Sequence, residues 1–107
     1  MEKTKLTILN PTIKSTISED EYKTSSYSMV YELTNSGDHD LIITNIICSC
    51  GCTVPSFTRQ PIKPNETTFV KLGFNPKNKK GLNVKSCEIF ANIPNSPAKL
   101  SFEVTVK

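Results

Sequence analysis

The chain has 107 residues, a length that accommodates one domain with a single two-layer core but not two independent domains. Thirteen basic and ten acidic side chains give a net charge of +3, which is too small to indicate binding to nucleic acid or to an anionic membrane surface. No stretch approaches the roughly 18 consecutive apolar residues that span a bilayer, so we expect a single domain over 1–107 with no transmembrane segment.

Short alternating segments separated by turns account for the first third of the chain. Residues 4–9 and 26–34 alternate apolar and polar side chains, as half-buried strands do. A weaker extended segment lies between them, around Ile13 and Ile17. The glycine and asparagine in 35–38 predict a compact turn, because both residues tolerate positive φ. The buried face of the second strand is predicted to carry Met29, Tyr31 and Leu33.

The most hydrophobic run of the chain, residues 41–48, predicts a central strand. The run is rich in isoleucine and too short for a globular helix. Its first apolar residues occupy odd positions and its later ones even positions. Both sets can face the core only if the strand bulges near Thr44 or Asn45.

The second half of the chain continues the pattern of short strands. Residues 54–57 are few and contain Pro55, which predicts an edge strand or a loop. A tight turn is expected at 61–66, with Asn65 in the left-handed conformation. Further strands are expected around Val70 to Phe74, Cys87 to Ile89 and Leu100 to Val106, separated by loops at 75–81 and 92–97.

Strands of this length and spacing, with no segment of helical periodicity, indicate an all-β fold. The natural architecture is an immunoglobulin-like antiparallel β-sandwich of about seven strands. The chain contains no tryptophan, so the antibody pattern of two distant cysteines bracketing a tryptophan is missing. The expected similarity is therefore to the general architecture and not to antibody domains.

Three of the four cysteines lie within residues 48–52, the one place where chemistry is concentrated. In an extended strand, Cα atoms two residues apart are about 6.6 Å apart, near the upper limit for a disulfide. Cys50 and Cys52 could therefore bond only if the chain bends between them, and Gly51 is the residue that would allow the bend. A disulfide closing so small a ring would be comparatively easy to reduce, which is the physical basis for a redox role.

Two interpretations of Cys48 and Cys87 are open, as free thiols or as part of a disulfide. They could be buried thiols that pack like small apolar side chains in adjacent strands. A bond from Cys48 or Cys52 to Cys87 would instead join distant parts of the sandwich, with a stabilisation of about 2 to 4 kcal/mol. Four cysteines allow three pairings, and the sequence alone does not choose among them.

We expect no bound metal or cofactor, and Cys50 and Cys52 are the only candidate metal ligands. Zinc sites use four ligands in paired spacings, whereas this chain has one crowded group and the lone Cys87. Copper(I) tolerates fewer and softer ligands, so it is the better match of the two metals.

No residue pattern predicts a catalytic site. His39 stands between two aspartates, but the three residues lie in an expected hairpin tip, where a solvated loop is the natural reading. No serine lies in a Gly-x-Ser-x-Gly sequence, and the four glycines are too scattered to form a phosphate-binding loop. We therefore expect no enzymatic activity.

Four stretches resemble a known bacterial family, named domain of unknown function 1573, which is similar to the immunoglobulin-like modules of hydin and related ciliary and centrosomal proteins. The resemblance covers about 26–107. It departs from the family pattern at Asn65, where glycine is usual, and around Thr12 to Ile17, where a Phe-Gly element is not recognisable. Cys48 and Cys87 lie outside the family motif. The stretches are Tyr31 to Asp38, Leu41 to Ile43, Ser49 to Thr53 and Pro61 to Glu66.

The resemblance implies a secreted, non-enzymatic protein. Members are typically exported, often as lipoproteins, and are common in Bacteroidota. We therefore expect a periplasmic or cell-surface location with the export signal removed, or a cytoplasmic one if Met1 is the native start. The expected function is recognition or assembly with an unidentified protein partner. The alternative is a thiol redox or soft-metal (copper or zinc) module that uses Cys50 and Cys52.

Overall fold

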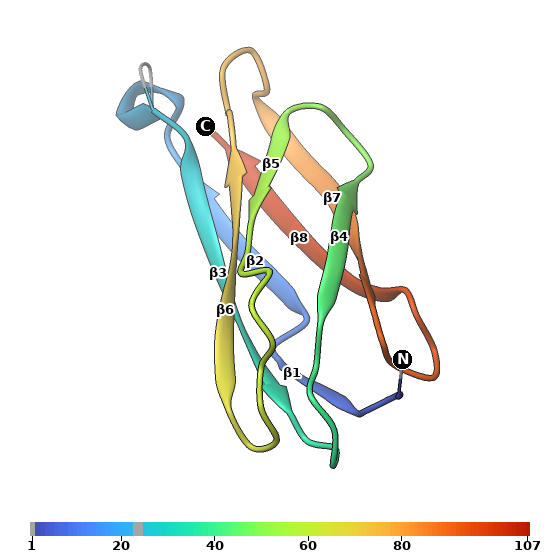
Figure 1. Ribbon diagram of the computed structural model, residues 1–107. Coiled ribbons are helices and arrows are strands. Elements are labelled where there is room, and N and C mark those ends of the chain that lie inside the picture. The colour runs from blue at the N-terminus through green and yellow to red at the C-terminus, as the bar shows by residue number, and fades with distance from the viewer. Residues whose placement is uncertain (1, 23–24) are drawn as a thin grey trace.

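The computed structural model describes residues 2–22 and 25–107. Figure 1 shows two layers of strands that face each other. The molecule measures 45 × 20 × 19 Å. No helix among the described residues has the length and apolar character needed to cross a membrane. In chain order the elements are β1 (Leu6–Leu9), β2 (Thr12–Ile17), the 3-10 helix η1 (Glu19–Tyr22), β3 (Tyr27–Asn35), β4 (Ile43–Cys48), β5 (Thr53–Ser56), β6 (Thr67–Phe74), β7 (Gly81–Ala91) and β8 (Ala98–Val106).

The strands form two four-stranded sheets. Sheet A has the order β1-β3-β6-β5 and sheet B the order β2-β8-β7-β4. All neighbouring pairs are antiparallel except β2 and β8, which run parallel. The predicted immunoglobulin-like sandwich is thus confirmed, with eight strands among the described residues where about seven were expected, because the weak segment around Ile13 and Ile17 forms the complete strand β2.

In the described part of the chain, consecutive strands lie in different sheets at five connections: β1–β2, β2–β3, β3–β4, β4–β5 and β6–β7. Asn10, with a φ of 53°, and Pro11 carry the chain from β1 in sheet A to β2 in sheet B. Residues 49–52 carry it from β4 in sheet B to β5 in sheet A.

The core fills that space with side chains from both sheets. Met29, Tyr31 and Leu33 are buried, as their alternation predicted. The rings of Phe74 and Phe102 meet across the layers with centroids 5.4 Å apart. The remaining members of the core include Leu41, Ile43, Ile46, Val70, Leu72, Ile89, Leu100 and Val104.

The prediction that residues 41–48 form a central strand is wrong, because β4 lies at the edge of sheet B. The predicted bulge is confirmed by a register shift between Ile43 and Asn45. The bulge turns Ile43 and Ile46 both toward the core, while Ile47 is about half exposed on the outer face. The continuous apolar sequence of residues 41–48 therefore reflects the bulge, which shifts the core-facing positions by one residue. It does not mean that both faces of the strand are covered.

Two buried asparagines hold together the loops at one end of the sandwich. The Asn35 side-chain oxygen accepts hydrogen bonds from Thr4 Oγ1 and the Gly37 N–H, and its Nδ2 donates to the carbonyls of His39 and Ile62. The Asn92 side chain accepts from the Ile42 N–H and donates to the carbonyls of Glu2 and Asp40. Together they position the start of β1 against the β3–β4 connection.

Candidate functional site

The cysteine loop, residues 50–52, lies at the end of the molecule that also carries η1 and the β6–β7 turn (Figure 1). Cys50 and Cys52 are joined by a disulfide, and their Cα atoms are 5.3 Å apart. This separation is shorter than the roughly 6.6 Å of a straight strand, so the chain bends between them as the sequence geometry required.

Backbone hydrogen bonds hold the cysteine loop independently of its disulfide. On one side, the Ser49 N–H donates to the Ser86 carbonyl at 2.9 Å. Within the loop, the Thr53 N–H donates to the Cys50 carbonyl at 3.2 Å, and the Asn75 N–H donates to the Cys52 carbonyl, also at 3.2 Å. The path of the chain therefore does not depend on the sulfur–sulfur bond alone.

Gly51 is exposed at the tip of the loop, and its role differs from the predicted one. Its φ lies outside the left-handed region, and a Cβ added at this position would meet no heavy atom within 4 Å. An alanine would fit this bend, so glycine is not needed to make it. The consequence of Gly51 is instead that the tip of the loop itself carries no side chain.

Cys48 and Cys87 form the second disulfide, so the reading of both as free thiols is wrong. The two residues lie directly opposite each other in the neighbouring strands β4 and β7. Cys87 is 1% exposed and belongs to the core. This bond closes a sequence separation of 39 residues and fastens the edge strand β4 to sheet B.

The environment of the two sulfurs in the cysteine loop is asymmetric. The Cys52 N–H donates to Cys50 Sγ at 3.1 Å, whereas Cys52 Sγ lies 3.9 Å from Thr53 Oγ1. Both cysteines are partly exposed. Cys50 Sγ is therefore the sulfur on which negative charge would be better stabilised.

Within residues 2–22 and 25–107, no group of three or more His, Cys, Asp or Glu side chains is placed to hold a metal ion. Sulfur binds metals as the thiolate, so copper or zinc could bind Cys50 and Cys52 only after the disulfide is reduced. Metal binding at this pair stays a prediction. His39 lies at the other end of the molecule, with Nε2 2.7 Å from Glu2 Oε2 and both side chains largely exposed.

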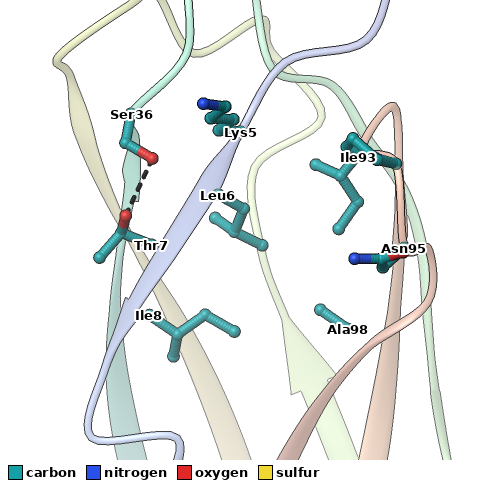
Figure 2. Close-up of a pocket in the computed structure, with 9 residues that line it drawn as sticks. Lys5, Leu6, Thr7, Ile8, Ser36, Ile93, Asn95 and Ala98 are labelled. Atoms are coloured by element: carbon teal, nitrogen blue, oxygen red, sulfur yellow. Dashed lines mark hydrogen bonds between the residues drawn. The ribbon is translucent and has the colours of Figure 1, made fainter.

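A groove beside β1 was not found by sequence reasoning. Its volume is about 550 Å³. Figure 2 shows that it lies between β1 and the β7–β8 connection. Leu6 and Ile8 line it on the β1 side, and Ile93 and Ala98 face them from the other (Figure 2). Its rim carries Lys5, Ser36 and Asn95.

The groove adjoins an unpaired strand edge. The Ser36 N–H donates to the Lys5 carbonyl, and the register of β1 with β3 then turns the N–H and C=O groups of Leu6 and Ile8 away from β3. Among the described residues, none hydrogen-bonds these four outward groups. The β1 edge and the apolar groove together form the β1 groove site.

The other three sheet edges carry features that oppose pairing. In β5, Pro55 lacks the N–H that would face outward. In β4, the Thr44 carbonyl accepts a hydrogen bond from Arg59 at 2.7 Å, and the Ile46 N–H donates to the Asn45 side-chain oxygen. In β2, Lys14 stands at the middle of the strand and pairs with Glu103 of β8 at 3.5 Å.

The model of the family described as "Protein of unknown function (DUF1573)" matches residues 13–106. The chain belongs to this family. The match covers β2 to β8 and the cysteine loop, so the predicted resemblance is confirmed for nearly the whole DUF1573 chain. A search of curated proteins finds no match.

Solved structures share the fold of this DUF1573 chain at low sequence identity. A protein of unknown function from Porphyromonas gingivalis W83 has a TM-score of 0.81 at 12% identity, over 97% of this chain and 47% of that one. The PapD-like domain 7 of human CEP192 has a TM-score of 0.67 at 13% identity, over 98% and 87%. The E. coli chaperone DraB has a TM-score of 0.66 at 7% identity, over 96% and 55%.

These structures establish the fold alone. The DUF1573 chain spans about half of the Porphyromonas gingivalis protein and about half of the DraB chaperone. The architecture thus occurs both as one part of longer chains and, in the CEP192 domain, as most of the chain compared.

Proposed function

We propose that this DUF1573 chain is a non-enzymatic, extracytoplasmic recognition module that binds an extended segment of a partner protein in the β1 groove. The observation that carries the proposal is the unpaired edge of β1 directly beside an apolar groove. An extended segment satisfies both features at once, because its backbone pairs with an open strand while alternate side chains point to one side.

The site suggests the chemistry of the bound segment. Leu6 and Ile8 offer two N–H and two C=O groups, enough for a paired segment of about four residues. Alternate side chains of that segment would enter the groove against Ile93 and Ala98, so they would be apolar. Lys5 at the rim favours an acidic side chain at one end of the segment.

The two disulfides support an extracytoplasmic location. Disulfides persist in oxidising compartments and are rare in a bacterial cytosol, and all four cysteines are bonded here. The chaperone fold of DraB and the Porphyromonas gingivalis neighbour are compatible with a periplasmic or cell-surface protein of Bacteroidota. Export as a lipoprotein, expected from the family resemblance, belongs to the same proposal.

The test is site-specific photo-crosslinking in an extract of secreted and periplasmic proteins. A crosslinking residue at Ser36 or Asn95 reports on the groove, and one at Lys80, in the turn between β6 and β7, reports on the opposite end. We expect one partner to be captured from the two groove positions and not from Lys80. Equal capture from all three positions would contradict the proposal.

A backbone substitution shows whether strand pairing holds the partner. Leu6→Pro removes an outward N–H while leaving the bonds between β1 and β3, and we expect it to weaken binding by about tenfold. Leu6→Ala is the matched control, since it loses the same side chain but keeps the N–H. Equal binding by the two variants would show that the β1 edge is not used.

A further inference from the structure

We propose that Cys50–Cys52 is a redox-active disulfide that exchanges with a dithiol of another protein, and that Cys50 is its leaving-group sulfur. This inference is independent of the β1 groove, which lies toward the other end of the molecule. It uses the cysteine loop, whose chemistry the recognition function leaves unexplained.

The fold of the cysteine loop does not depend on the Cys50–Cys52 bond. Three backbone hydrogen bonds fix the loop from Ser49 to Thr53, with donors at Ser49, Thr53 and Asn75. The bond itself closes a sequence separation of 2, against 39 for Cys48–Cys87, so it restricts the unfolded chain far less. Its reduction is therefore opposed by little loss of folding free energy, and the two thiols stay in place to re-form it.

The Cys50–Cys52 disulfide is accessible to another protein. Cys50 and Cys52 are partly exposed, and the position of a Cβ at Gly51 has no neighbour within 4 Å. Cys87, by contrast, is 1% exposed. A thiolate from another chain can therefore approach either sulfur of the cysteine loop, whereas in the second disulfide only Cys48 is partly exposed and Cys87 is buried. Exposed disulfides are the ones that exchange.

The two sulfurs of the cysteine loop have different surroundings. The Cys52 N–H, 3.1 Å from Cys50 Sγ, would stabilise a thiolate at Cys50. A thiol of lower pKa is the faster leaving group in thiol–disulfide exchange. Attack on Cys52 Sγ with departure of Cys50 is thus the favoured direction of cleavage.

The exchange is balanced without any further reactant. A partner thiolate attacks Cys52 Sγ, the Cys50–Cys52 bond breaks, and the electron pair leaves on Cys50 Sγ. The partner's second thiolate then attacks the partner sulfur of the mixed disulfide and releases Cys52. The partner is oxidised to a disulfide, Cys50 and Cys52 are reduced, and the two protons of the partner thiols end on them. One chain oxidises one dithiol, and a protein disulfide oxidant of the compartment would restore the bond by the same chemistry.

The test incubates the intact chain with a reduced peptide carrying two cysteines and follows both by acid quenching, alkylation and mass spectrometry. We expect one equivalent of peptide disulfide per chain, with the alkylated protein cysteines confined to Cys50 and Cys52. The double variant Cys50→Ala/Cys52→Ala should transfer none. Reduction of Cys48–Cys87 before Cys50–Cys52, or no transfer above the buffer rate, would overturn the proposal.

Two single variants test the asymmetry, and neither removes the Cys52 backbone N–H. Cys52→Ala leaves a free thiol at Cys50 beside this N–H, and Cys50→Ala leaves a free thiol at Cys52. Followed by thiolate absorbance against pH, Cys50 should titrate at the lower pKa, and it should be alkylated about tenfold faster at mildly acidic pH. Equal titration of the two thiols would overturn the assignment of Cys50.

Discussion

At the scale of single residues, Tyr31 shows how the fold changes the pKa of a side chain. Its ring is 1% exposed in sheet A, and its hydroxyl donates to the Ser101 carbonyl of sheet B at 2.6 Å. Burial, followed by the charge of Tyr27, raises the pKa of Tyr31 from 10.0 to about 12. The phenol therefore joins the two sheets as a neutral hydrogen-bond donor.

This shift predicts loss of stability in alkali. Between pH 10 and 12 the unfolded chain releases the Tyr31 proton while the native chain keeps it, so the stabilisation is complete below pH 10 and lost as pH rises through 12. The loss is on the order of 2 kcal/mol. In urea unfolding at stepped pH, Tyr31→Phe should be less stable at pH 8 by about 1 kcal/mol but fall less steeply above pH 10. Parallel curves for the two proteins would contradict this account.

Gly37 and Gly51 form a matched pair of glycines with opposite surroundings. A Cβ at Gly37 would collide with Thr4 Oγ1 and the backbone nitrogen of Lys5, whereas a Cβ at Gly51 would meet nothing within 4 Å. We expect Gly37→Ala to lower the free energy of unfolding by about 1 to 3 kcal/mol. Gly51→Ala should leave it unchanged or raise it by up to about 1 kcal/mol. Thermal unfolding measures both, and similar melting temperatures for the two variants would show that Gly37 is not crowded.

The sequence predicts single residues where their role is local. Asn65 was expected in the left-handed conformation, and its φ of 69° confirms this. Asn35 and Asn92 were not singled out, although each is buried and makes several hydrogen bonds. Their partners lie up to 90 positions away along the chain, so no local pattern marks them.

At the scale of elements, alternation predicts where the strands are but not where they stand in a sheet. The core face of β3, the bulge of β4 and the edge position of β5 were all predicted. The edge position of β4 was not, since a bulged edge strand and a central strand both give a continuous apolar run. Strand order depends on pairings between distant segments, which twofold periodicity does not record.

The two disulfides should differ in their effect on stability. Closing a separation of 39 residues stabilises a fold by about 4 kcal/mol in the chain-entropy account, and closing a separation of 2 by less than about 2 kcal/mol. We therefore expect Cys48→Ala/Cys87→Ala to lose more than twice the free energy of unfolding lost by Cys50→Ala/Cys52→Ala. Guanidinium unfolding of the two double variants gives the comparison, and equal losses would mean that the cysteine loop is as important to the fold as the β4–β7 bond.

At the scale of the whole molecule, the two candidate sites are far from each other. The cysteine loop and the β1 groove lie toward opposite ends of the sandwich, as Figure 1 shows for the elements that carry them. The cysteine loop could be found in the sequence because its residues are contiguous. The β1 groove could not, since it is assembled from residues near positions 6, 36 and 95, which only the folded chain brings together.

This separation predicts that the two sites act independently. Effects of distant sites without shared partners are additive. Leu6→Pro should therefore leave the rate of exchange at Cys50–Cys52 unchanged, and Cys50→Ala/Cys52→Ala should leave crosslinking from Asn95 unchanged. Measuring each activity in both variants provides the check, and a change of more than about threefold in either cross-measurement would show that the sites are coupled.

The parallel pairing of β2 with β8 also sets the order in which the fold can be completed. Thr12 meets Ser101 across 89 positions of the sequence, and β8 is the partner of both β2 and β7. Sheet B therefore cannot close until residues 98–106 are available. A chain that emerges amino-terminus first holds β2 and β7 without their common neighbour until β8 has emerged. The pairing of sheet B is therefore delayed relative to the synthesis or export of β2 by the roughly 80 residues between β2 and β8.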